Sequence, residues 1–154
     1  MSEDAQSSGH RARALARIAN RTSPNELRQI AKNARAKGEE EVRLAAQRRL
    51  YEVLPSEQPG TLEYDVWQSI YALEGELSDE RGKTVRLSRT RQKITRDKEA
   101  KTVADLIMGS PSEGYRMLID RDMEDLTFEA VALRHPDRFE QRVLDAARDR
   151  LSAF

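Results

Sequence analysis

Apolar residues return every three or four positions along this chain, and that spacing constrains the fold more than any other feature. The longest run is Val66, Ile70, Leu73 and Leu77. Such spacing puts the side chains on one face of an α-helix, whereas a half-buried strand needs strict alternation. Charged residues make up 35% of the chain and hydrophobic residues 38%, a balance typical of helices with narrow apolar stripes. We therefore predict an all-α fold.

Capping signals place the first clear helices. Ser23 supplies an N-cap hydroxyl, and Glu26 stands at the capping-box position. Pro24 fits the first helical position, where its missing N–H would have no partner within the helix. Gly38 is suited to end this helix, and a second apolar stripe follows over residues 39–54. The sequence predicts a helical hairpin here.

The next segment predicts one long central helix from about residue 62 to residue 96. Thr61 is a suitable N-cap, and the heptad phase of Val66 continues through Leu87 and Ile94. Gly82 lies inside this range and costs roughly 1 kcal/mol in a helix interior, so a bend is expected there. The apolar run Val66, Ile70, Leu73 and Leu77 is interpreted either as core or as the seam of a homodimer.

The last third predicts a small C-terminal bundle of short helices, with caps at Ser112 and Thr127. The expected organisation is a disordered tail over residues 1–10, a helical body over 11–101 and a helical subdomain over 102–154. Residues 102–120 also have the outline of a helix-turn-helix, with Gly109 in the turn and Arg116 on the second helix. The match is imperfect, and an ordinary helical hairpin is the favoured interpretation of that segment.

The sequence contains few residues or motifs that indicate a catalytic or metal-binding site. Cysteine is absent, and His10 and His135 are the only histidines, so no thiolate or zinc site is predicted. Nucleotide-binding, hydrolase and metalloprotease motifs are absent too. The acidic residues between Asp120 and Glu129 are interpreted as solvated helix caps, because negative charge is favoured at helix starts. We predict no enzyme, no cofactor and, without an apolar leader or membrane-length segment, a cytoplasmic protein.

Charge is segregated along the chain although the net charge is zero. Residues 51–80 hold eight acidic and no basic side chains, whereas residues 81–101 hold nine basic and two acidic ones. A row of arginines favours phosphate, because each guanidinium donates two parallel hydrogen bonds. We predict a nucleic-acid-binding, regulatory or accessory protein, with DNA as the partner and RNA as the alternative. The predicted contact residues are Arg81, Lys83, Arg86, Arg89, Arg91, Lys93, Arg96 and Arg116.

A second interpretation stays open. The acidic block over residues 51–80 can neutralise the basic segment within one chain or between two copies. The protein is then a dimeric helical protein-interaction module without nucleic-acid binding. Trp67 and Tyr71 would be anchors for a protein partner in that case.

Overall fold

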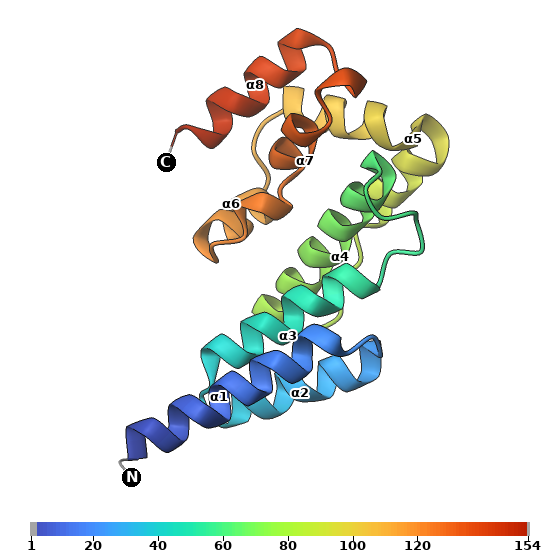
Figure 1. Ribbon diagram of the computed structural model, residues 1–154. Helices are drawn as coiled ribbons and strands as arrows, with labels where there is room; N and C mark the ends of the chain where they lie inside the picture. The colour runs from blue at the N-terminus through green and yellow to red at the C-terminus, as the bar shows by residue number, and fades with distance from the viewer. Residues whose placement is uncertain (1–2, 154) are drawn as a thin grey trace. The chain divides into compact units, whose positions relative to one another are not determined.

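The computed structural model describes residues 3–153, with side chains from residue 8 onward. These residues form eight α-helices and two short 3-10 helices, and no strand (Figure 1). The predicted all-α class is thereby confirmed. The chain divides into two compact units, residues 1–54 and residues 55–154.

The N-terminal unit consists of three helices: α1 (Glu3–Asn20), α2 (Pro24–Ala36) and α3 (Glu40–Val53). The Ser23 hydroxyl accepts a hydrogen bond from the Glu26 amide at 3.3 Å, so the capping signal acts as predicted. Helices α2 and α3 pack against each other, and α1 packs on α3. Their small core is the cluster Ile18, Leu27, Ala34, Val42 and Ala46.

The expected disordered tail is wrong for residues 3–10, which form the first turns of α1. Residues 1–2 lie outside the described residues. The reason for the helix is cooperative: residues 11–20 already form a helix, and extending an existing helix avoids the cost of a new nucleus. No proline stands in residues 3–20 to stop that extension.

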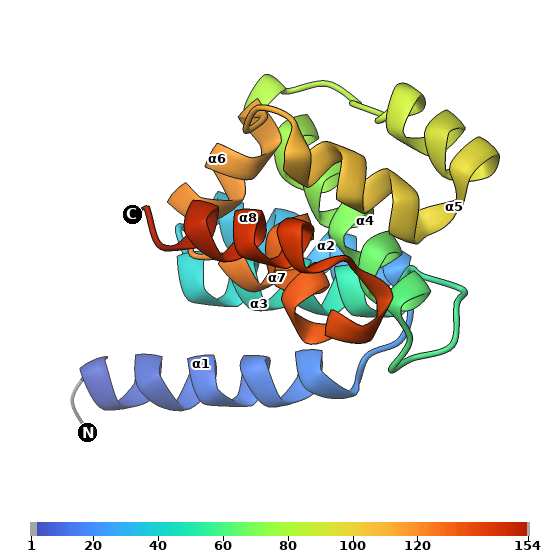
Figure 2. The same cartoon turned by 90° about the horizontal axis from the view of Figure 1, so that it is seen from above.

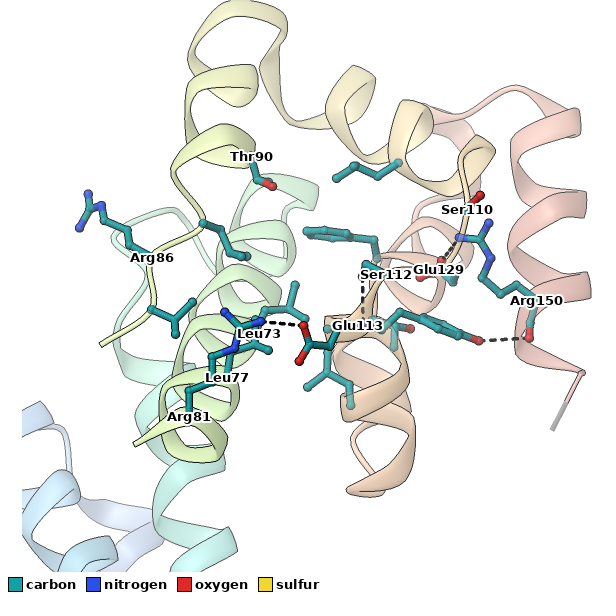
Figure 3. Close-up of a pocket in the computed structure, with 18 residues that line it drawn as sticks. Leu73, Leu77, Arg81, Arg86, Thr90, Ser110, Ser112, Glu113, Glu129 and Arg150 are labelled. Atoms are coloured by element: carbon teal, nitrogen blue, oxygen red, sulfur yellow. Dashed lines mark hydrogen bonds and ion pairs between the residues drawn. The ribbon is translucent and has the colours of Figure 1, made fainter. Parts of the chain in front are cut away.

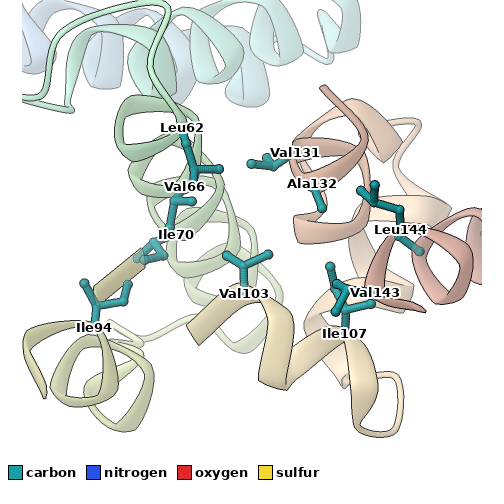
Figure 4. Close-up of a cluster of buried hydrophobic side chains, with 11 residues drawn as sticks. Leu62, Val66, Ile70, Ile94, Val103, Ile107, Val131, Ala132, Val143 and Leu144 are labelled. Carbon is teal, nitrogen blue, oxygen red and sulfur yellow. The ribbon is translucent and has the colours of Figure 1, made fainter. Parts of the chain in front are cut away.

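The C-terminal unit holds the remaining elements. They are α4 (Leu62–Arg81), α5 (Ser88–Met108), α6 (Glu113–Asp120), η1 (Glu124–Leu126), α7 (Phe128–Arg134), η2 (Pro136–Arg138) and α8 (Gln141–Leu151). Figure 4 shows the core of this unit, where Val66 and Ile70 from α4 lie across from Val103 of α5. Val131 of α7 and Val143 of α8 belong to the same cluster. Burying each such side chain stabilises the unit by roughly 1.5–3 kcal/mol.

The single long helix predicted over residues 62–96 is wrong. Helix α4 ends at Arg81, because Gly82 takes a left-handed conformation with φ of 66° that terminates the helix. The chain is non-helical until Ser88, and α5 then changes direction at Lys98, where φ is 74° (Figure 2). Folding back brings Ile94 into the core beside α4, a gain in burial that a straight helix would lose.

The predicted boundary between residues 101 and 102 does not coincide with the observed division. Helix α5 crosses that point and packs against α4, α7 and α8. Residues on both sides of it, such as Ile94 and Val103, share one apolar cluster. A segment without a core of its own is not a separate domain.

Candidate nucleic-acid interface

The predicted phosphate-binding residues divide into two groups, and the first is engaged by the protein's own carboxylates. Arg91 is the most completely engaged. Its Nε and Nη2 atoms donate to the two carboxylate oxygens of Glu74 at 2.8 and 2.7 Å, and the side chains are only 19% and 12% exposed. The guanidinium also lies over the ring of Trp67, 5.2 Å from its centre, and over that of Tyr71 at 5.6 Å. The bond to Glu74 raises the pKa of Arg91. Arg91 therefore ties α5 to α4 and is not available to phosphate.

Lys93 is held in a similar way. Its ammonium donates to Asp105 at 2.7 Å and to Asp97 at 2.9 Å. The bond to Asp105, followed by that to Asp97, raises the pKa of Lys93. Because Asp105 lies beyond the change of direction at Lys98, this contact joins the two segments of α5. The fold of α5 therefore leaves the Lys93 ammonium paired with two carboxylates.

Arg81 and Arg96 are paired but remain accessible. Arg81 meets Glu113 at 2.6 Å, and Arg96 meets Asp97 at 3.4 Å. The Arg96 side chain is 68% exposed, so solvent screens this pair and it contributes little. The neighbouring carboxylate weakens the electrostatic attraction of each cation for a phosphate.

The second group consists of Lys83, Arg86 and Arg89, which we call the cationic turn. All three are exposed, and none of their side chains has a hydrogen-bond or ion-pair partner among the residues that the structure describes. They occupy the segment before α5 and its first turn. That turn contains no acidic residue, and its N-cap, Leu87, offers no side-chain acceptor to the amides. The positive end of the helix dipole thus adds to the three charges.

Arg116 stands apart from the cationic turn. It is exposed on α6, again without a partner among the described residues. Neither the helix-turn-helix outline nor the ordinary helical hairpin expected over residues 102–120 is formed, because α6 packs against α4 and η1 instead of pairing with α5. Gly114 permits this approach: a Cβ atom there would lie 2.6 Å from the Leu73 side chain. Arg116 is therefore not presented by a recognition helix.

The expected dimer seam is in fact interior. Val66, Ile70, Leu73 and Leu77 are 0%, 0%, 7% and 5% exposed within the chain's own C-terminal unit. Side chains buried in this way offer no surface to a second copy. The interpretation of this run as core is the one that the structure supports.

The other partly buried ion pairs of the C-terminal unit hold its helices together. His135 Nε2 lies 2.7 Å from Asp65, which also meets Arg134 at 3.5 Å, so the end of α7 is fixed to the start of α4. Arg121 joins the end of α6 to α4 through Glu76, a fully buried carboxylate, at 2.8 Å. Within residues 8–153, no group of three or more acidic or histidine side chains is placed to hold a metal ion.

Sequence reasoning missed the acceptors that engage the basic segment. Glu74 belongs to the acidic block over residues 51–80, so internal neutralisation was a stated alternative, but its target, Arg91, was not identifiable. Asp97 was the signal for Lys93, since it stands four residues after it, the spacing of a helical ion pair.

Comparisons with known proteins give no relative. No family model matches the chain, and neither the curated proteins nor the solved structures contain a significant match. Among the helices that the structure describes, none is long and apolar enough to cross a membrane.

Proposed function

We propose that this protein is a non-enzymatic nucleic-acid-associated protein that contacts the phosphate backbone through the cationic turn. The observation that supports the proposal is the set of three exposed cations, Lys83, Arg86 and Arg89, that no described carboxylate neutralises. Their contacts are suited to backbone phosphates and carry no base specificity. Duplex DNA is the expected partner and duplex RNA the alternative.

The proposed surface is smaller than the row of seven cations in the sequence, and binding is correspondingly weaker. Three phosphate contacts correspond to a log-log salt slope of about −2.7. The C-terminal unit holds 16 basic and 20 acidic side chains, so its overall field opposes a polyanion. We expect a dissociation constant in the range of about 10⁻⁴–10⁻⁶ M that is typical of non-specific binding.

Fluorescence anisotropy tests the proposal with a labelled 25-base-pair duplex, titrated with the full chain between 20 and 200 mM salt. The triple variant Lys83→Glu, Arg86→Glu and Arg89→Glu should abolish measurable binding. A matched control, Lys37→Glu, Arg142→Glu and Arg148→Glu, changes the net charge equally at exposed positions elsewhere. Equal loss in both variants would reduce the effect to net charge, and absence of binding by the unmodified protein at 20 mM salt would refute the proposal.

A further inference from the structure

The C-terminal unit contains a cavity of about 380 Å³ that the nucleic-acid proposal does not use. Its wall is formed by α4, the segment before α5, α5, α6 and α7 (Figure 3). The apolar part of the lining includes Leu73, Leu77, Val85, Leu87, Leu118 and Phe128. The volume lies within the range of about 300–1,000 Å³ that is usual for small-molecule sites.

One end of the cavity is polar. Glu129 is 4% exposed, and its Oε2 atom accepts a bond from Arg150 at 2.6 Å. The other oxygen, Oε1, has no hydrogen-bond partner among the described residues and is not completely buried. Because Glu129 lines the cavity, we take Oε1 to be an acceptor that faces the cavity.

Arg150 does not offer a comparable anchor for an anion. Its Nη1 atom donates to Glu129, and its Nη2 atom donates to the carbonyls of Ile107, at 2.8 Å, and Gly109. An anionic ligand would meet the Glu129 carboxylate, and three of the five guanidinium N–H groups beside it are already engaged. A cationic ligand would have to give up its hydration beside Arg150, a like charge. A neutral hydrogen-bond donor avoids both penalties.

We propose that this cavity binds a small neutral amphipathic molecule, with a hydrocarbon body against the leucines and one hydroxyl that donates to Glu129 Oε1. The mouth suits such a ligand. Leu106 borders it and is 37% exposed, one of two large hydrophobic side chains at the surface of the described chain. Arg86 of the cationic turn also lines the cavity, and in Figure 3 its guanidinium points away from the other labelled lining side chains.

Straight-chain alcohols test the hydrocarbon part. Full-length, ¹⁵N-labelled protein is titrated with 1-hexanol, 1-heptanol and 1-octanol, and amide shifts are followed by NMR. Affinity should rise up to roughly fourfold for each added methylene, the gain expected from burying it. Saturable shifts should concentrate at residues 85–90, 106–118 and 127–129. Shifts that do not saturate, or that spread evenly over both units, would overturn the proposal.

Head-group changes test the donor. The ether 1-methoxyheptane has the same number of heavy atoms as 1-octanol but no hydroxyl hydrogen, and should bind about tenfold more weakly because Glu129 Oε1 then gains no bond. Octanoate and octylammonium should also bind more weakly than 1-octanol. Equal binding of the ether contradicts the assigned acceptor, and tighter binding of either ion contradicts the neutral class.

A filled cavity gives the matched protein control. Thr90 lines the cavity, and its hydroxyl has no hydrogen-bond partner among the described residues, so Thr90→Phe should occupy the space and abolish 1-octanol binding. Thr84→Phe introduces the same ring at an exposed position outside the lining and should leave binding unchanged. Equal loss in both variants would count against the site. The ligand series decides the proposal even where Thr90→Phe does not fold.

Discussion

Two stretches of one basic segment, residues 81–90 and residues 91–101, hold four and five basic side chains but differ in how these are paired, and both acidic residues of the segment lie in the second stretch. Arg91 and Lys93 are drawn against Glu74 and Asp105, whereas Lys83, Arg86 and Arg89 remain open. The difference arises where the chain folds back: past Arg91, α5 lies near acidic side chains of α4 and of its own second segment. A count of charges along a sequence therefore sets an upper limit on a binding surface, and the fold decides how much of it remains.

Neighbouring arginines give the sharpest test of this comparison. Arg91→Met should lower the free energy of unfolding by about 2–4 kcal/mol, because it leaves the half-buried Glu74 carboxylate without its main partner. Arg89→Met, two residues away, should change it by less than about 0.5 kcal/mol, as exposed substitutions do. Urea denaturation followed by circular dichroism measures both. Similar losses for the two variants would show that the division between paired and open cations is wrong.

Single cations should differ in the same way in DNA binding. Removing one side chain of the cationic turn, as in Arg89→Ala, should reduce the salt slope by about 0.9, the contribution of one phosphate contact. Lys93→Ala should leave the slope unchanged, since Asp97 and Asp105 already neutralise that ammonium. Anisotropy titrations at four salt concentrations resolve the two. A slope that falls for Lys93→Ala would place Lys93 among the contacts.

Removing the carboxylate partners of Lys93 should turn this paired cation into an open one. Asp97→Asn with Asp105→Asn releases Lys93, which follows Arg89 by one helical turn and so lies on the same face of α5. Duplex affinity should rise, with a slope steeper by at least about 0.9, because Arg96 and Lys101 lose a carboxylate partner as well. The variant Asp145→Asn with Asp149→Asn removes two exposed acidic charges from α8 and serves as the control. An equal gain in the control would attribute the effect to net charge.

The sequence predicted those parts of the fold that depend on residues close together in the chain. Local signals were read correctly: the Ser23 cap and the helical periodicity of α4 depend on neighbours within a few residues. The long helix failed because Gly82 was treated as a bend, although a left-handed glycine ends a helix when burial rewards the return of Ile94. Spacing alone cannot distinguish a core from a dimer seam, since Leu73 has the same pattern in either.

The site was harder to predict, because its availability depends on contacts far apart in sequence. The pairing of Arg91 with Glu74 spans 17 residues and crosses a turn whose geometry the sequence did not fix. The cavity likewise gathers Leu77, Leu118 and Phe128 from three elements that are far apart in sequence. Only the pair Lys93 and Asp97, four residues apart within one helix, was open to local reasoning.

The smallest expected effect is on the pKa values of Asp97 and Asp105. The hydrogen bond from Lys93 lowers the pKa of Asp97, and bonds from Lys93 and Lys101 lower the pKa of Asp105. Because the folded-state pKa of each carboxyl lies below its unfolded value of 3.8, their contribution to stability is present above that value and is lost as the pH falls through the folded pKa. Carboxyl ¹³C NMR titration should give midpoints below 3.8 for both, and Lys93→Met should return the Asp97 midpoint toward 3.8 while Arg89→Met leaves it unchanged. Midpoints at the ordinary value in the unmodified protein would mean that Lys93 is as open as its neighbours in the cationic turn, and the distinction between the two stretches would no longer hold at that residue.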